Sequence, residues 1–304
     1  MPKFFLDGFL SAESQMLHVL DQENGNTFRT KPENIAHEKY LYAIEQSDKT
    51  NYEKEGLERA FAEFEGMVAS VIRELSLNKT IPEGRDYSIL INYIALMICR
   101  VPIMIKTFAE SIIKIADMSI KMATSNEEKY QMLLEDLKKN GYEIKNYPDY
   151  EEFKEFLYSD RYTTDVNQNY KLKTIIDSTN LLIPILAQRK WSYLFVDETL
   201  GGFICSDNPV ALVSKLKPTF YHRQGFAMAN TEVSMPLSKN VAIVGKFEGN
   251  EESGFASPKG LAVLNSRTGM YSNRFIFSAT DDFIFLNENG EIENRNDLIK
   301  AIKG

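Results

Sequence analysis

The sequence contains few of the residues from which common catalytic and metal sites are built. Its 304 residues include only two cysteines, three histidines and one tryptophan. The Cys-x-x-Cys, His-x-x-x-His and Glu-x-x-His spacings are absent, so no zinc site is predicted. The Gly-x-Ser-x-Gly elbow, the Walker loop and the Gly-x-Gly-x-x-Gly fingerprint are absent as well. The sequence therefore gives no support to a serine-elbow hydrolase or to a protein that binds phosphate through a glycine-rich loop.

The net charge and the short apolar runs limit the classes of partner that the chain is expected to bind. The net charge is −8, whereas a broad nucleic-acid surface needs clustered lysine and arginine, so no such surface is predicted. The apolar segment 87–99 has thirteen residues before Arg100 interrupts it, against the ~20 that span a bilayer, so a buried helix and no membrane partner are expected. The first ten residues carry Asp7 and lack a signal-peptide pattern. Cys99 and Cys205 each lie in an apolar run, which favours reduced, buried thiols and a cytoplasmic location.

Helical and strand patterns occupy different parts of the chain. A hairpin with an Asn24-Gly25 turn is expected within residues 1–31, and helical periodicity dominates residues 32–190. Residues 191–304 hold short β-branched and aromatic runs separated by turn residues, followed by a terminal helix. This order predicts an α+β fold, in which a helical N-terminal two-thirds packs on a mostly antiparallel C-terminal sheet. Since no repeat or low-complexity linker interrupts the sequence, a single domain over residues 1–304 is predicted.

Two residues are expected to bound the long apolar helix. Asp86 precedes its first apolar positions and is predicted to cap its start. Pro102 has no N–H for the carbonyl of Ile98, so the helix is predicted to break there.

A polar quartet, Ser206-Asp207-Asn208-Pro209, interrupts the apolar run FICSDNPVALV. In one interpretation these side chains satisfy their own backbone in an Asx or Ser turn. In the other they form a site, with Asp207 as the acid and Asn208 and Ser206 as orienting groups. In both cases a carboxylate between apolar strands needs a cation, a metal or several hydrogen-bond donors.

Arg100 is a cation at the end of a helix that is expected to be buried. A buried guanidinium either pairs with a carboxylate or receives an anionic ligand, and both alternatives stay open. Glu58 and Glu65 are candidates for that pair, for general-base work or for metal binding, and the alternative for both is a solvated helix edge. Arg274 could face Asp207 across the sheet.

Several strings in the chain resemble those of one known family. They are PKFFLDGFL, LHVLDQENGNTFRTKPENIAHEKYLY and YEKEGLERAFAEFE, followed by the landmarks Arg100-Val101-Pro102, Trp191, Ser206-Asp207-Asn208-Pro209, Pro236-Leu237-Ser238, Asn265 and Arg274. In order and spacing they resemble the domain of unknown function family 4238 over nearly the whole chain. The resemblance implies a mainly bacterial family without an assigned activity. Members usually carry His-Tyr immediately before the x-Pro step, and here Met1-Pro2 leaves that histidine without a counterpart.

Two functional hypotheses follow from these residues. The first is a hydrolase that acts on an anionic substrate such as a phosphoester, a nucleotide or a nucleic acid. Its candidate catalytic residues are Asp207, Glu65, Asn208 and Ser206, and its candidate substrate-binding residues are Arg100 and Arg274. A divalent cation such as Mg²⁺ or Mn²⁺, held by Asp207 and Glu65, fits this hypothesis. The second hypothesis is a non-catalytic binding or regulatory protein, in which the same residues form a buried ion-pair network.

Overall fold

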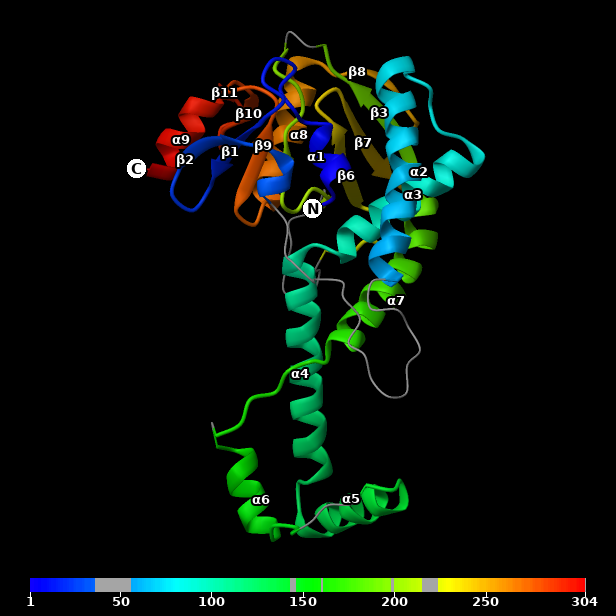
Figure 1. The fold of residues 1–304 in the computed structure, drawn as a ribbon, viewed down its shortest axis with the longest axis vertical. Coiled ribbons are helices and arrows are strands. Elements are labelled where there is room, and N and C mark those ends of the chain that lie inside the picture. Colours follow the sequence, from blue (N-terminus) through cyan, green and yellow to red (C-terminus); the bar gives the residue numbers. More distant parts are fainter. Residues whose placement is uncertain (36–55, 143–145, 160, 198–199, 215–223, 304) are drawn as a thin grey trace. The chain divides into compact units, whose positions relative to one another are not determined.

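The computed structural model describes residues 1–35, 56–142, 146–159, 161–197, 200–214 and 224–303. The chain forms two compact units, a larger one of residues 1–104 with 175–304 and a smaller one of residues 105–174. A compact unit need not fold alone, so the single-domain interpretation stays a prediction. The predicted α+β class is confirmed, because helices fill most of the chain up to residue 187 and mostly antiparallel strands follow (Figure 1).

The first sheet of the larger unit joins the N-terminal hairpin to strands from the C-terminal part. Its order is β2-β1-β9-β4, and each neighbouring pair is antiparallel. Its strands are β1 (Leu17–Asp21), β2 (Asn26–Thr30), β4 (Cys205–Ser206) and β9 (Phe275–Ser278). The predicted hairpin is confirmed, and Gly25 has the positive φ of 67° that its turn requires. Figure 1 shows β1 between β2 and β9.

The second sheet has the order β5-β6-β7-β3-β8, in which only the β3–β8 pair is parallel. Its strands are β3 (Lys190–Phe195), β5 (Ala211–Ser214), β6 (Thr231–Ser238), β7 (Val241–Lys246) and β8 (Gly254–Phe255), and a separate ribbon pairs β10 (Ile284–Leu286) with β11 (Ile292–Asn294). Trp191 of β3 lies against Gly245 of β7, where a Cβ atom would be 2.8 Å from the indole ring. Only glycine leaves room for the tryptophan there.

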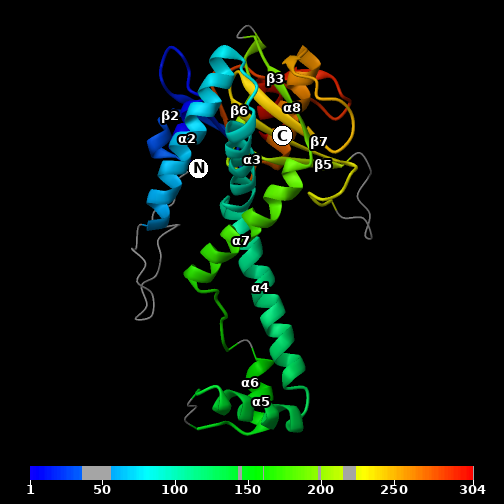
Figure 2. The same ribbon diagram turned by 90° about the vertical axis from the view of Figure 1, so that its right-hand side faces the viewer.

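Helices of the larger unit pack beside these sheets. They are α1 (Lys3–Asp7), η1 (Pro32–Asn34), α2 (Gly56–Asn78), α3 (Gly84–Cys99), α8 (Pro258–Tyr271) and α9 (Arg295–Lys303), while α4 (Pro102–Ala123) and α7 (Gln168–Ala187) each run from one unit into the other. α2 and α3 lie side by side (Figure 2).

The two predicted boundaries of α3 have different outcomes. The helix begins at Gly84, so Glu83 takes the N-cap position and Asp86 lies in the first turn, and the predicted cap is wrong. The break at Pro102 is confirmed, since α3 ends at Cys99 and α4 starts at the proline. Among the described helices none is long and apolar enough by itself to cross a membrane, and only the bent pair α3 and α4 reaches that length and composition together.

The smaller unit contains most of α4 together with α5 (Glu127–Lys139) and α6 (Tyr150–Leu157). Asn126 and Asp149 cap α5 and α6, because their side chains accept hydrogen bonds from the third residue after each cap. Tyr130 stacks on Phe153 with ring centroids 4.9 Å apart, and its hydroxyl donates to the carbonyl of Pro148. These contacts hold α5 against α6.

One apolar cluster fixes α9 against the first sheet. Its buried members come from β1, the residue before β4, β9 and the segment between β9 and β10, and they are Leu20, Ile204, Ile276 and Phe283. Leu298, Ile299 and Ile302 of α9 pack on this cluster. The first residue of α9, Arg295, is thereby placed beside the end of β9.

Candidate functional site

The polar quartet at the end of β4 forms a closed turn. The Ser206 hydroxyl donates to the carbonyl of Asn208 at 2.8 Å and accepts from the Asn208 amide at 3.3 Å. The Asn208 side chain donates to the carbonyl of Tyr271 at 2.9 Å. Both side chains are therefore used by the backbone, as the turn interpretation expects.

The Asp207 carboxylate anchors the loop that leads into β9. It accepts from the backbone amides of Asn273, Arg274 and Phe275 at 2.8, 2.9 and 3.1 Å, and from the Ser272 hydroxyl at 3.3 Å. Four donors occupy most of the lone-pair positions of a carboxylate. This geometry favours a structural role for Asp207 over an acid that meets substrate.

Arg100, the C-cap residue of α3, forms an ion pair with Glu65 of α2. Arg100 Nη1 lies 2.7 Å from Glu65 Oε1, and the side chains are 8% and 19% exposed. The guanidinium also lies over the Phe61 ring at 5.2 Å. Of the two glutamates considered for this pair, Glu65 is the partner. Its oxygen is taken by the guanidinium, which supports the ion-pair interpretation of Arg100.

The charges of the Glu65–Arg100 pair act on two further groups, the Tyr93 phenol and the Met1 amino group. Burial raises the pKa of the Tyr93 phenol well above its usual value, and the Tyr93 hydroxyl is buried without a partner among the described residues. Burial and the charge of Arg100 lower the pKa of the Met1 amino group to about 6, against the charges of Glu65 and Asp207. Asp207 and Arg100 are each held by their own partners.

Arg274 does not direct its side chain to Asp207. Its guanidinium contacts the buried Asp21 at the end of β1, with Nη2 2.9 Å from Asp21 Oδ2. The hydrogen bond from Arg274 lowers the pKa of the Asp21 carboxyl against the effect of burial. Only the backbone N–H of Arg274 reaches Asp207. The predicted substrate-binding guanidinium is therefore engaged in an ion pair across the sheet.

The carboxylates proposed for a divalent cation do not form a ligand set. Asp207 accepts from loop amides and Glu65 accepts from Arg100. Within the described part of the chain, no group of three or more His, Cys, Asp or Glu side chains is arranged to hold a metal ion.

A cavity of about 370 Å³ opens beside the first sheet. One wall of the cavity is formed by the first sheet. In this sheet His18 of β1 is paired with Arg29 of β2 and with Ser278 of β9. Residues paired across antiparallel strands project their side chains on the same face. The remaining lining comes from the loops at residues 11–14, 201–202, 239–240 and 279–281. Cavities of this size accommodate small ligands.

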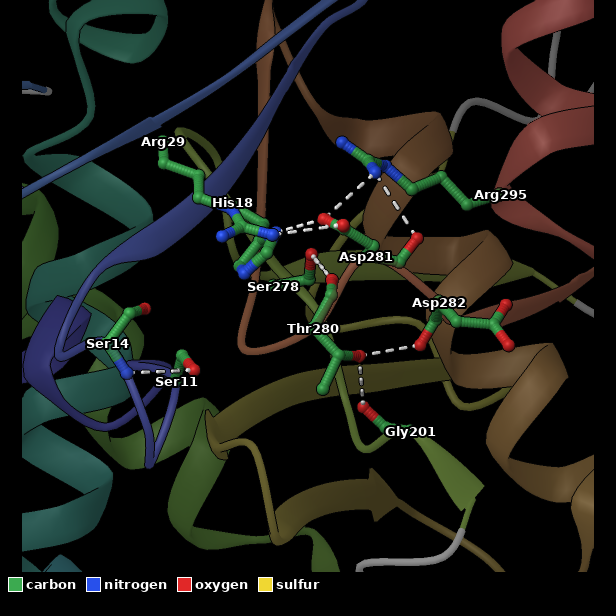
Figure 3. A network of polar contacts seen from close by, with 10 residues as sticks. All are labelled: Ser11, Ser14, His18, Arg29, Gly201, Ser278, Thr280, Asp281, Asp282 and Arg295. Carbon is green, nitrogen blue, oxygen red and sulfur yellow. Dashed lines mark hydrogen bonds and ion pairs between the residues drawn. The ribbon is translucent and has the colours of Figure 1, made fainter.

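A histidine and an aspartate meet in this cavity. His18 Nδ1 contacts a carboxylate oxygen of Asp281, which follows β9 (Figure 3). His18 is only 6% exposed. His18 lines the cavity, and the hydrogen bonds of the described residues include none to its Nε2 atom. The Asp–His contact leaves the second ring nitrogen available to a ligand.

Two arginines complete the surroundings of Asp281. Arg29 Nη2 lies 3.2 Å from Asp281 Oδ2, and the buried Arg295 donates to the Asp281 carbonyl at 3.2 Å and lies 3.5 Å from its carboxylate (Figure 3). The Asp281 side chain is 61% exposed, and partial desolvation alone would raise the pKa of its carboxyl. The charge and hydrogen bond of His18, together with Arg29, outweigh burial and lower that pKa below its usual value. Asp281 is therefore ionised near neutral pH and orients the imidazole.

The comparison with family models identifies the chain. The model described as protein of unknown function (DUF4238) matches residues 1–288. The chain belongs to DUF4238. No curated protein and no solved structure matches it. The family resemblance predicted from the sequence is confirmed for this DUF4238 chain.

The sequence did not point to the cavity of this DUF4238 member. In the sequence His18 lies in the apparent strand MLHVLD, and a hairpin turn explains the acidic pair Asp281-Asp282. The register of β1 with β9 brings the two residues together. It pairs His18 with Ser278, which lies three residues before Asp281 in the chain. Arg29 follows from the register of the hairpin, which pairs it with His18.

Proposed function

We propose that this DUF4238 protein is a hydrolase that acts on a small anionic substrate in the cavity beside His18. The observation that carries the proposal is the contact of His18 Nδ1 with Asp281 between two residues that line the cavity, with no hydrogen bond of Nε2 among the described residues. A cytoplasmic location, expected from the two buried free cysteines, is part of the proposal.

The contact supports a general-base role for His18. Ionised Asp281 holds the Nδ1–H tautomer, so that the lone pair of Nε2 faces the cavity. Nε2 takes a proton from a bound water molecule as the water oxygen attacks the substrate, and Asp281 stabilises the imidazolium that forms. Arg29, beside both groups, attracts the negative charge of the substrate. In this mechanism the carboxylate remains ionised throughout.

The adjacent aspartates provide a matched pair of variants for the test. Asp281→Asn removes the carboxylate that orients His18, whereas Asp282 is exposed and its carboxylate points away from His18 (Figure 3). Among the described contacts only the backbone carbonyl of Asp282 accepts a hydrogen bond, from Thr280. The two substitutions are chemically identical, so a difference between them reports the role of the position.

The expected result is a loss of hydrolysis in the variants of the dyad. Hydrolysis of p-nitrophenyl phosphate and bis(p-nitrophenyl) phosphate is followed by release of p-nitrophenol. His18→Asn and Asp281→Asn are expected to lower kcat/KM by about 10²–10⁴-fold, while Asp282→Asn retains the activity. A wild-type protein that hydrolyses neither ester, or an Asp281→Asn protein as active as Asp282→Asn, contradicts the proposal.

The buried Glu65–Arg100 pair supports a second candidate, a non-catalytic binding or regulatory protein. In that case the residues named from the sequence join α2 to α3 and β4 to the loop before β9, and the cavity binds a ligand without turnover. The two candidates differ in the same assay. A ligand that stabilises the wild-type protein but is not hydrolysed favours the binding protein.

A further inference from the structure

The arginine behind the His18–Asp281 contact is buried, although most arginines lie on protein surfaces. The side chain of Arg295, the first residue of α9, is only 8% exposed, whereas that of Asp281 is mostly exposed. The Arg295 Nε atom is buried and has no hydrogen-bond partner among the described residues. Burial lowers the pKa of this guanidinium, against the attraction of Asp281. A buried cation with an unmade hydrogen bond costs free energy, so stability alone does not account for its position.

Arg295 lies against the carboxylate oxygen that contacts the histidine. Asp281 Oδ1 contacts His18 Nδ1, and Arg295 Nη1 lies 3.5 Å from the same oxygen (Figure 3). Nη1 also donates to the Asp281 carbonyl at 3.2 Å, so one guanidinium contacts both the backbone and the side chain of Asp281. Arg29 contacts the other oxygen, Oδ2, and its own side chain is 54% exposed. Because a buried side chain has fewer accessible rotamers than an exposed one, Arg295 is the less mobile of the two cations.

The packing of α9 fixes this guanidinium in turn. The backbone N–H of Arg295 donates to the carbonyl of Phe283 at 3.0 Å, and three apolar side chains of α9 pack on the cluster that contains Phe283. The family model matches residues 1–288, so α9 lies outside the matched part of the chain. Arg295 is not one of the residues that line the cavity. Any effect of Arg295 on a reaction in the cavity must therefore be transmitted through Asp281.

We infer that Arg295 is a positioning residue of this site, which holds the Asp281 carboxylate in the orientation that keeps the Nδ1–H of His18 directed at it. The inference rests on the proposed function, since it gives Arg295 a part in the general-base step of the hydrolase. Without Arg295 the exposed Asp281 side chain can turn toward Arg29 and the solvent. The imidazole then loses the group that orients it. Misplacing a catalytic group by about 1 Å can lower a rate about 100-fold.

Replacing Arg295 with methionine removes the cation and keeps a long side chain. In Arg295→Met the kcat for the two nitrophenyl esters is expected to fall about 10- to 100-fold, while KM stays nearly unchanged because Arg295 does not line the cavity. The urea midpoint is expected to match that of the wild type, because the Asp281 carboxylate is mostly exposed and keeps Arg29. Arg295→Lys restores a cation and is expected to recover part of kcat. Lys300→Met removes a 77% exposed cation from the same helix, so this matched control is expected to leave kcat unchanged.

A proton resonance tests the contact in the full chain without any substrate. A ring N–H that is held in a hydrogen bond exchanges slowly with water. Wild-type His18 is therefore expected to give a resolved Nδ1–H signal, which is assigned by its loss in His18→Asn. The signal is expected to disappear in Arg295→Met, because the freed N–H exchanges with water, and to persist in Lys300→Met.

The outcomes separate this inference from the hydrolase. Loss of kcat and of the Nδ1–H signal in Arg295→Met, with an unchanged urea midpoint, supports both. Turnover by the wild type, with the same kcat and signal in Arg295→Met, overturns the inference and leaves the hydrolase. A loss of activity that only follows a lower urea midpoint, while the folded variant keeps the signal, overturns the inference as well. A wild type that hydrolyses neither ester overturns the hydrolase, and loss of the signal in Arg295→Met then still supports the positioning of Asp281 by Arg295.

Discussion

Replacing Arg100 with methionine is expected to lower the free energy of unfolding by about 3–5 kcal/mol, because it leaves the carboxylate of Glu65 in a largely buried position without its cation. The double variant Arg100→Met with Glu65→Leu is expected to recover most of this loss, since both charges are then removed. Urea unfolding followed by the fluorescence of Trp191 measures the effect, because this single tryptophan is 3% exposed in β3 of the same unit.

Arg85→Met in α3, the helix that Arg100 caps, provides the control. Arg85 is exposed, and its one described side-chain hydrogen bond is a weak contact of 3.8 Å to the sulfur of Met67. This substitution is expected to leave the unfolding curve nearly unchanged. If Arg100→Met and Arg85→Met unfold at the same urea concentration, the Glu65–Arg100 pair does not stabilise the packing of α2 on α3.

The second large effect is expected at Asp207. Asp207→Asn replaces an acceptor of four hydrogen bonds with an amide whose NH₂ group faces the donors of residues 272–275. A cost of about 3 kcal/mol is expected, as for the loss of a satisfied charge-assisted network. Activity should fall only in proportion to the unfolded fraction, because Asp207 does not reach the cavity beside His18.

This prediction separates the two interpretations of the quartet. A catalytic Asp207 requires the opposite pattern, in which the melting temperature is preserved and the activity is lost. Asp282→Asn, which removes an exposed carboxylate in the same unit, is the control for the change from acid to amide. A melting temperature of the Asp207→Asn protein equal to that of Asp282→Asn contradicts the anchoring role.

Much of the fold could be predicted from local patterns. The Asn24-Gly25 turn and the break at Pro102 depend on residues close together in the chain, so composition and spacing are sufficient to locate them. The α+β class also follows, because the helical and strand patterns are separate along the sequence. The start of α3 was misjudged because a helix boundary depends on backbone geometry at Gly84 rather than on the nearest acidic residue.

The candidate site depended on information that is not local. The choice of Glu65 as the partner of Arg100 was one of two alternatives, and the packing of α2 on α3 decides it. The meeting of His18 with Asp281 requires β1 to join β9 across more than 250 residues, in a register that a single sequence does not reveal. None of the three histidines lies in a recognised catalytic or metal-binding spacing, so nothing in the sequence singled out His18. A single histidine beside a carboxylate is nevertheless sufficient for general-base chemistry.

The most direct test of the central claim, that the cavity beside His18 is the functional site, is a nuclear magnetic resonance titration with orthophosphate. The chain has three histidines, so ¹⁵N labelling of their rings yields three sets of signals, and the His18→Asn variant assigns one of them. We expect orthophosphate to shift the His18 Nε2 signal in a saturable manner. If orthophosphate binds while the His18 ring signals stay unchanged, the ligand occupies another place and the account is wrong.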